Sequence, residues 1–128
     1  EFSMIDMANV AYYPRIFDLA HKVFEEAWLE MCGVSYPTLV NEHRVGFPVV
    51  SLSSTFLAPL RYGDTITATV KISSIGTTSL GWHYAFRNQD GMDVWVSEQT
   101  TVCVDMNTIE KQPIPSHLLP GLRQHMEG

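Results

Sequence analysis

A chain of 128 residues is long enough for one folded core and short for two, so we expect residues 1–128 to form one domain. Hydrophobic residues make up 45% and charged residues 17% of the chain, which is typical of globular proteins and argues against disorder. The formal net charge is −6 and the eight lysines and arginines are scattered, so we expect no nucleic-acid partner. No apolar run approaches the roughly 18 residues of a membrane span, so we expect no membrane partner.

The first predicted element is a long amphipathic helix from Pro14 to about Met31. Apolar residues recur there at three- and four-residue steps, which is the period of one helix face. These residues are Ile16, Phe17, Ala20, Val23, Phe24, Ala27, Trp28 and Met31. Pro14 suits the first helical turn, and Gly33 predicts the helix end. Before this helix the chain begins Glu1-Phe2 without a methionine, so we expect a first strand to be shortened or missing.

After a loop at Tyr36-Pro37, β-branched and aromatic residues between turn signals predict strands. Four strands are expected, near 48–58, 64–75, 79–89 and 93–106. One helix followed by a meander of strands with short loops favours an α+β fold, in which an antiparallel sheet packs on the helix. The proline-rich segment from Thr108 is expected to be a surface tail or a short helix.

A carboxylate precedes the predicted helix start, because Asp6 lies a few residues before Pro14. The N-terminus of a helix leaves backbone N–H groups unpaired and carries a partial positive charge. It can therefore polarise a carbonyl group while a nearby carboxylate attacks that group or activates water. The alternative is that Asp6 only caps the helix or a turn, a common structural role of aspartate.

The other reactive side chains form no known catalytic or metal-binding pattern. The histidines at positions 21, 43 and 83 have no partner at the spacing of metal ligands, so we expect no metal site. Cys32 and Cys103 stand far apart in the sequence, which predicts reduced thiols in a cytoplasmic protein and not a disulfide framework or a zinc knuckle.

The segment Asp6-Met-Ala-Asn-Val-Ala-Tyr-Tyr-Pro, followed by one long helix, resembles the Asp-x-x-(Gly/Asn)-(Val/Ile)-x-(Tyr/Trp)-Tyr signature of hot-dog-fold thioesterases related to 4-hydroxybenzoyl-CoA thioesterase. The resemblance continues in order through Gly46-Phe-Pro-Val-Val-Ser51, Phe56 and Arg61-Tyr-Gly-Asp64-Thr-Ile, and it covers about residues 2–106. It implies a hot-dog fold, in which a curved antiparallel sheet wraps around one helix. It also implies a homodimer or homotetramer, with sheets paired edge to edge and acyl-thioester sites at the subunit boundary.

The resemblance also assigns roles at the start of the chain. Asp6 matches the family's catalytic carboxylate, acting as nucleophile or as general base on water. The backbone N–H of Tyr13, near the helix N-terminus, would hold the thioester oxygen. Asn9 and Tyr12 are expected to contact the substrate, Tyr12 as an aromatic lining of the acyl pocket. Some members use a helix carboxylate instead, and Glu30 would be the candidate if it faced inward.

The acyl pocket is expected to be lined by Phe47, Val49 and Trp82. The substrate implied is a coenzyme A thioester, with no metal and no bound cofactor. The family's basic cluster for the phosphates of coenzyme A is replaced here by Ile75-Gly-Thr-Thr78. A phosphate contact would have to come from Lys71, Arg87, Lys111 or Arg123.

Hydrolysis of an acyl-CoA thioester is therefore the leading prediction, and two alternatives stay open. A hot-dog hydratase or dehydratase would need a histidine five residues after Asp6, where the chain has Ala11. A non-catalytic dimer that binds acyl thioesters would keep the same pocket, so the sequence does not distinguish it from an enzyme.

Overall fold

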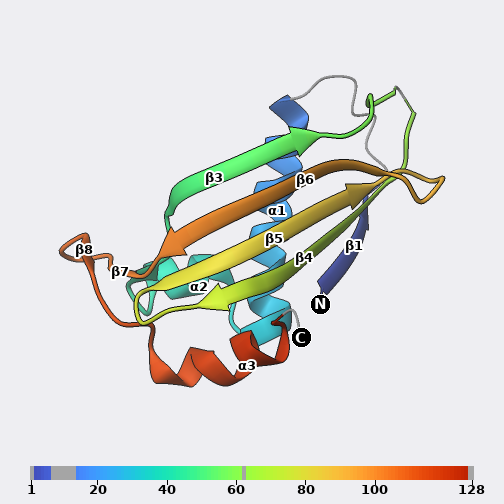
Figure 1. Ribbon diagram of the computed structural model, residues 1–128. Coiled ribbons are helices and arrows are strands. Elements are labelled where there is room, and N and C mark those ends of the chain that lie inside the picture. Colours follow the sequence, from blue (N-terminus) through green and yellow to red (C-terminus); the bar gives the residue numbers. More distant parts are fainter. Residues whose placement is uncertain (1, 7–13, 62, 127–128) are drawn as a thin grey trace.

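In the computed structural model, a five-stranded antiparallel sheet curves around one long helix, α1 (Figure 1). The structure describes residues 2–6, 14–61 and 63–126, with the backbone alone for 2–6 and 14. The order of strands across the sheet is β1-β4-β5-β6-β3. These elements are β1 (Phe2–Asp6), α1 (Pro14–Cys32), β3 (Val49–Phe56), β4 (Ile66–Ile75), β5 (Ser79–Arg87) and β6 (Asp93–Val102).

Helix α1 follows its predicted bounds closely. The apolar stripe faces the sheet except at Phe17, which is 43% exposed, and Ile16, Val23 and Trp28 are completely buried. The helix ends at Gly33, which has a φ of 70° and whose N–H donates to the carbonyl of Leu29 at 3.0 Å. A side chain would strain this left-handed conformation, so glycine suits the position.

The pairing of the strands corrects one part of the prediction. Strands β4, β5 and β6 form the expected meander, but β3 pairs with β6 and not with β4. The other edge of β4 is occupied by β1, which pairs from Phe2 opposite Val70 to Asp6 opposite Ile66. The first strand is thus present. Because β1 takes that edge, β3 lies at the opposite edge of the sheet.

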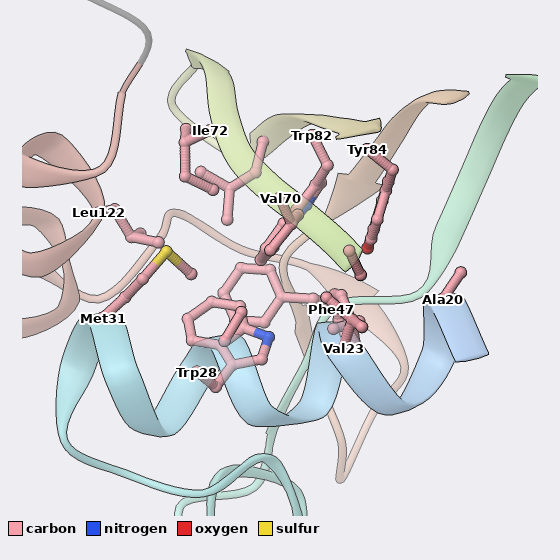
Figure 2. Packing of buried hydrophobic residues seen from close by; sticks show 14 of the residues in the cluster. Ala20, Val23, Trp28, Met31, Phe47, Val70, Ile72, Trp82, Tyr84 and Leu122 are labelled. Atoms are coloured by element: carbon pink, nitrogen blue, oxygen red, sulfur yellow. The ribbon is translucent and has the colours of Figure 1, made fainter. Parts of the chain in front are cut away.

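The core lies between α1 and the concave face of the sheet (Figure 2). Alternate residues of β5 point inward, so Trp82, Tyr84 and Phe86 are buried. Trp28 from α1 and Phe47 pack with their ring centroids 4.6 Å apart. This aromatic layer fixes the distance between the helix and the sheet.

The predicted loop at Tyr36-Pro37 is instead the start of a short helix, α2 (Tyr36–Asn41). Ser35 caps it, because its Oγ accepts a hydrogen bond from the backbone N–H of Thr38 at 3.2 Å. Pro37 lies in the first turn, where a missing N–H costs nothing. The sequence contained this capping signal, but the proline was interpreted as a loop residue.

The last predicted strand is interrupted after Val102, and the chain then enters a second small sheet with the order β2-β7-β8. Its strands are β2 (Val45–Gly46), β7 (Val104–Asp105) and β8 (Glu110–Lys111). The C-terminal segment forms the helical turn η1 (Ser116–Leu118) and the helix α3 (Leu119–Gln124), of which Leu122 is buried. The short-helix alternative is therefore correct for this end of the segment.

Candidate functional site

A pocket of about 270 Å³ lies between α1 and the side of the sheet that carries β3. Phe17, one turn into α1, lines it, so the pocket reaches the N-terminal part of the helix. Its lining is mostly apolar and comes from α1, α2, the start of β3 and the strands β5 and β6. The lining residues are Phe17, Ala20, His21, Phe24, Tyr36, Phe47, Pro48, Val49, Leu52, Tyr84 and Gln99.

Two of the residues predicted to contact a substrate, Phe47 and Val49, line this pocket. The backbone N–H of Phe47 donates to the Tyr36 hydroxyl oxygen at 2.9 Å, which fixes the wall of the pocket to α2. Val49 is half exposed at the start of β3. Trp82, the third expected lining residue, lies in the core instead, where its Nε1 donates to Thr101 Oγ1 at 2.9 Å.

Tyr84 and Gln99 also line the pocket, although neither was predicted there from the sequence. Side chains that fill a core and side chains that line a pocket follow the same alternation along a strand, so the sequence pattern did not identify Tyr84 as a pocket residue. Burial raises the pKa of Tyr84 well above its ordinary value, so its phenol stays neutral near pH 7. The pKa of Tyr36 is also raised, chiefly by burial.

One ion pair lies at the rim of the pocket. His21 Nε2 and Glu25 Oε2 are 3.6 Å apart, one turn from each other on α1, and both side chains are open to solvent. Glu30, the alternative helix carboxylate, is exposed and does not line the pocket.

The backbone of Asp6 ends β1 opposite Ile66. Helix α1 begins at the same end of the sheet (Figure 1). There Phe17 packs edge-on against Trp95, with ring centroids 5.7 Å apart. The strand end at Asp6 and the helix start thus share one end of the fold, although Asn9, Tyr12 and Tyr13 lie outside the described residues.

The four cations considered for the phosphates of coenzyme A do not line the pocket. Arg87 forms an ion pair with Asp93, with 2.7 Å between Nε and Oδ1.

Within residues 2–6, 14–61 and 63–126, no three histidine, cysteine or acidic side chains gather as metal ligands. No helix in this described part is long and apolar enough to cross a membrane.

The comparisons of this chain with known proteins point to one protein family. The family model of the thioesterase-like superfamily matches residues 2–122. A relative from Nostoc punctiforme is 27% identical over 132 residues, covering 99% of this chain and 86% of the relative. A relative from Thermosynechococcus vestitus is 25% identical over 126 residues, covering 98% and 86%. Both relatives are named 1,4-dihydroxy-2-naphthoyl-CoA hydrolase.

A solved structure of a thioesterase superfamily protein from Jannaschia sp. CCS1 superimposes with a TM-score of 0.89. Its sequence is 20% identical, and the match covers 99% of this chain and 94% of that one. At this identity the likeness shows the fold. Together with the sheet that wraps α1, it confirms the predicted hot-dog fold.

Proposed function

This chain belongs to the thioesterase-like superfamily and is a thioester hydrolase, and we propose that it hydrolyses an aromatic acyl-CoA thioester, with Asp6 and the Tyr13 backbone N–H at the reacting carbonyl. The observation that carries this proposal is the apolar pocket that starts beside the first turn of α1. Its volume of about 270 Å³ is smaller than the roughly 300–1,000 Å³ of pockets that enclose drug-sized ligands. It therefore suits an acyl group, with coenzyme A left outside.

The aromatic part of the proposal rests on the lining. Phe17, Phe24 and Phe47 present rings to the pocket, and such rings pack favourably on a flat aromatic acyl group. The cyanobacterial relatives are named hydrolases of a naphthoyl-CoA, which is also a flat aromatic thioester. Both considerations favour an aryl group over a long alkyl chain.

The proposed chemistry uses the carboxylate of Asp6 and the dipole of α1. Asp6 either attacks the thioester carbon or removes a proton from an attacking water molecule. The backbone N–H of Tyr13 and the positive end of α1 stabilise the negative charge that develops on the carbonyl oxygen. In the general-base route the C–S bond then breaks, and the proton held by Asp6 passes to the leaving thiolate. In the nucleophilic route the break leaves a mixed anhydride on Asp6, which a water molecule hydrolyses. Both routes consume one water molecule and give a carboxylic acid and coenzyme A as its free thiol. Coenzyme A is thus part of the substrate, and no metal or resident cofactor enters the scheme.

We also propose that two copies of the chain pair through β3, in a homodimer or in a homotetramer built from such dimers. This strand lies at a free edge of the sheet and exposes Val49, Val50 and Leu52. Exposed apolar edge strands tend to pair with another chain. Val49 and Leu52 also line the pocket, so a partner at this edge would cover its open side.

The free thiols of Cys32 and Cys103 are consistent with our proposal that the protein works in the cytoplasm.

The test is steady-state hydrolysis of a panel of aromatic, short-chain and long-chain acyl-CoA thioesters. We expect aromatic thioesters to give the highest kcat/KM. The substitution Asp6→Asn should lower kcat by about 10²- to 10⁴-fold, the usual contribution of a catalytic acid or base. Asp90→Asn, at an exposed aspartate of the β5–β6 turn, is the matched control and should retain full activity.

Full activity in Asp6→Asn would show that the assigned carboxylate is wrong. If the parent protein binds these thioesters but hydrolyses none of them, the non-catalytic alternative replaces the enzymatic proposal for this panel.

A further inference from the structure

Two exposed histidines that are far apart in the sequence lie side by side in the fold. His43 lies just beyond the C-terminal end of α2, and His117 belongs to η1. The centroids of their rings are 6.2 Å apart, and the ring planes are inclined at 55° to each other. More than half of the chain separates the two residues in the sequence, so no short motif reveals the pair.

These two imidazoles differ from the other histidines of the chain in their polar contacts. Within the part of the chain that the structure describes, the side chains of His43 and His117 form no hydrogen bond and no ion pair. Each of the others lies against an acidic side chain or a backbone carbonyl: His21 against Glu25, His83 against Glu98, and His125 against Gly121. A neutral imidazole has one nitrogen lone pair, which His43 and His117 can both offer to a metal ion.

We propose that His43 and His117 together bind a divalent transition metal ion such as Zn²⁺ or Ni²⁺, with water molecules as the remaining ligands. A Zn–N bond is about 2.0–2.1 Å long, so two imidazoles that share one ion have their centroids roughly 5–6 Å apart. The observed 6.2 Å is close to this range, and small rotations of two exposed side chains reach it. Imidazole selects Zn²⁺ and Ni²⁺ over Mg²⁺ and Ca²⁺, which prefer oxygen ligands.

The backbone beneath both rings is held in place by the fold. The N–H of His43 donates to the carbonyl of Thr38 at 3.1 Å, which fixes the turn after α2. Leu118, the residue after His117, is 1% exposed and belongs to the core. The two ligands are therefore brought together by folding, and a metal ion need order only the side chains.

A metal ion at this place would join two parts of the chain that meet only in the native state. It would tie η1 to the turn between α2 and β2, and η1 continues into α3. Helix α3 packs at the C-terminal end of α1, whereas Asp6 lies at the end of the sheet where α1 begins (Figure 1). The metal ion would thus stabilise the C-terminal segment and take no part in the proposed hydrolysis, so this inference is independent of the proposed function.

The experiment is calorimetric titration of the untagged full chain with ZnCl₂, repeated with NiCl₂ and MgCl₂. We expect Zn²⁺ and Ni²⁺ to bind at a single site per chain and Mg²⁺ not to bind. His43→Gln and His117→Gln should each weaken Zn²⁺ binding by about tenfold or more, because either change removes the chelate. His21→Gln is the matched control, since His21 is an exposed histidine 3.6 Å from a carboxylate, and it should keep the affinity of the parent.

Thermal unfolding separates the metal site from effects on folding. Zn²⁺ at about 100 times its Kd should raise the melting temperature of the parent by about 5 °C or more, and EDTA should reverse the rise. In EDTA, His43→Gln and His117→Gln should melt with the parent, because both positions are exposed. With Zn²⁺ present, hydrogen exchange should slow in η1 and α3 of the parent and not in either variant.

Absence of Zn²⁺ binding to the parent would overturn the inference. Binding that persists in the double variant His43→Gln/His117→Gln would overturn it as well, because it would show an adventitious ion only. The same holds if His21→Gln weakens binding as much as His43→Gln does. Loss of binding in both single variants, with unchanged melting in EDTA, would support the assigned site.

Discussion

At the scale of single residues, the three tryptophans of the core differ in how their indole N–H groups are satisfied. Trp82 donates to Thr101, and both side chains are buried. The indole N–H groups of Trp28 and Trp95 are buried without a hydrogen-bond partner within the part of the chain that the structure describes. The bond to Thr101 therefore fixes the position of Trp82 next to the aromatic layer, while Trp28 and Trp95 are held by packing.

Thr101→Val should lower the free energy of unfolding by about 1–3 kcal/mol, the usual cost of leaving a buried donor unpaired. Valine has nearly the shape of threonine and a high preference for strands, so the change isolates the hydrogen bond. Urea denaturation measures the effect. Thr100→Val, at the neighbouring position on the opposite face of β6, is the control and should be near neutral. Equal stabilities of the two variants would contradict the assigned role of the Trp82–Thr101 bond.

At the scale of elements, α3 approaches the end of α1 so closely that only glycine fits at the contact. A Cβ atom on Gly121 would overlap the backbone carbonyl of Met31. Leu122, the next residue, is buried in the core, so α3 is part of the packed structure. The close approach explains why a glycine stands inside a helix, where it is otherwise unfavourable.

Gly121→Ala should destabilise the protein by about 1–3 kcal/mol, because overpacking against rigid backbone outweighs the gain of up to about 1 kcal/mol in helix propensity. The measurement is thermal or urea unfolding, with hydrogen exchange to locate the change in α3. Gln124→Ala, at an exposed position of the same helix, should have little effect. A stabilised Gly121→Ala variant would show that α3 can shift without loss.

The elements that the sequence predicted well are those with a strong local pattern. The stripe of α1 and the alternation of β4 and β5 are repeated over many residues, so their bounds were nearly correct. The place of β3 beside β6 was not predictable in this way, because pairing between distant strands leaves no local signal. The pocket was predicted only through Phe47 and Val49, since Tyr84 and Gln99 come together only in the folded sheet.

At the scale of the whole molecule, the exposed edge of β3 is the surface through which we propose that two copies pair. A register shift between Val49 and Ser51 leaves Val50 outside the regular ladder and 58% exposed. Leu52 extends the same apolar edge. This edge adjoins the pocket, so association and activity should be coupled.

Val50→Lys should convert the proposed dimer to a monomer, because a charged lysine on an edge strand opposes pairing with another chain. Sedimentation at micromolar concentration measures the change, and kcat/KM for the best substrate should fall with it. Ile109→Lys is the control, since Ile109 is equally exposed but lies in the turn between β7 and β8. A parent protein that sediments as a monomer would contradict pairing through β3.

The strand order has a consequence for how far such association can extend. Strands β1 and β3 form the two outer edges of the sheet. If β3 pairs with β3 of a second copy about a two-fold axis, each chain uses the same edge, and the apolar edges of both copies are buried in one interface. Growth then stops at two sheets, whereas pairing of β3 with β1 would repeat from copy to copy as an open filament. Under the proposed pairing, the exposed apolar residues of β3 would therefore limit the shared sheet to two copies of the chain.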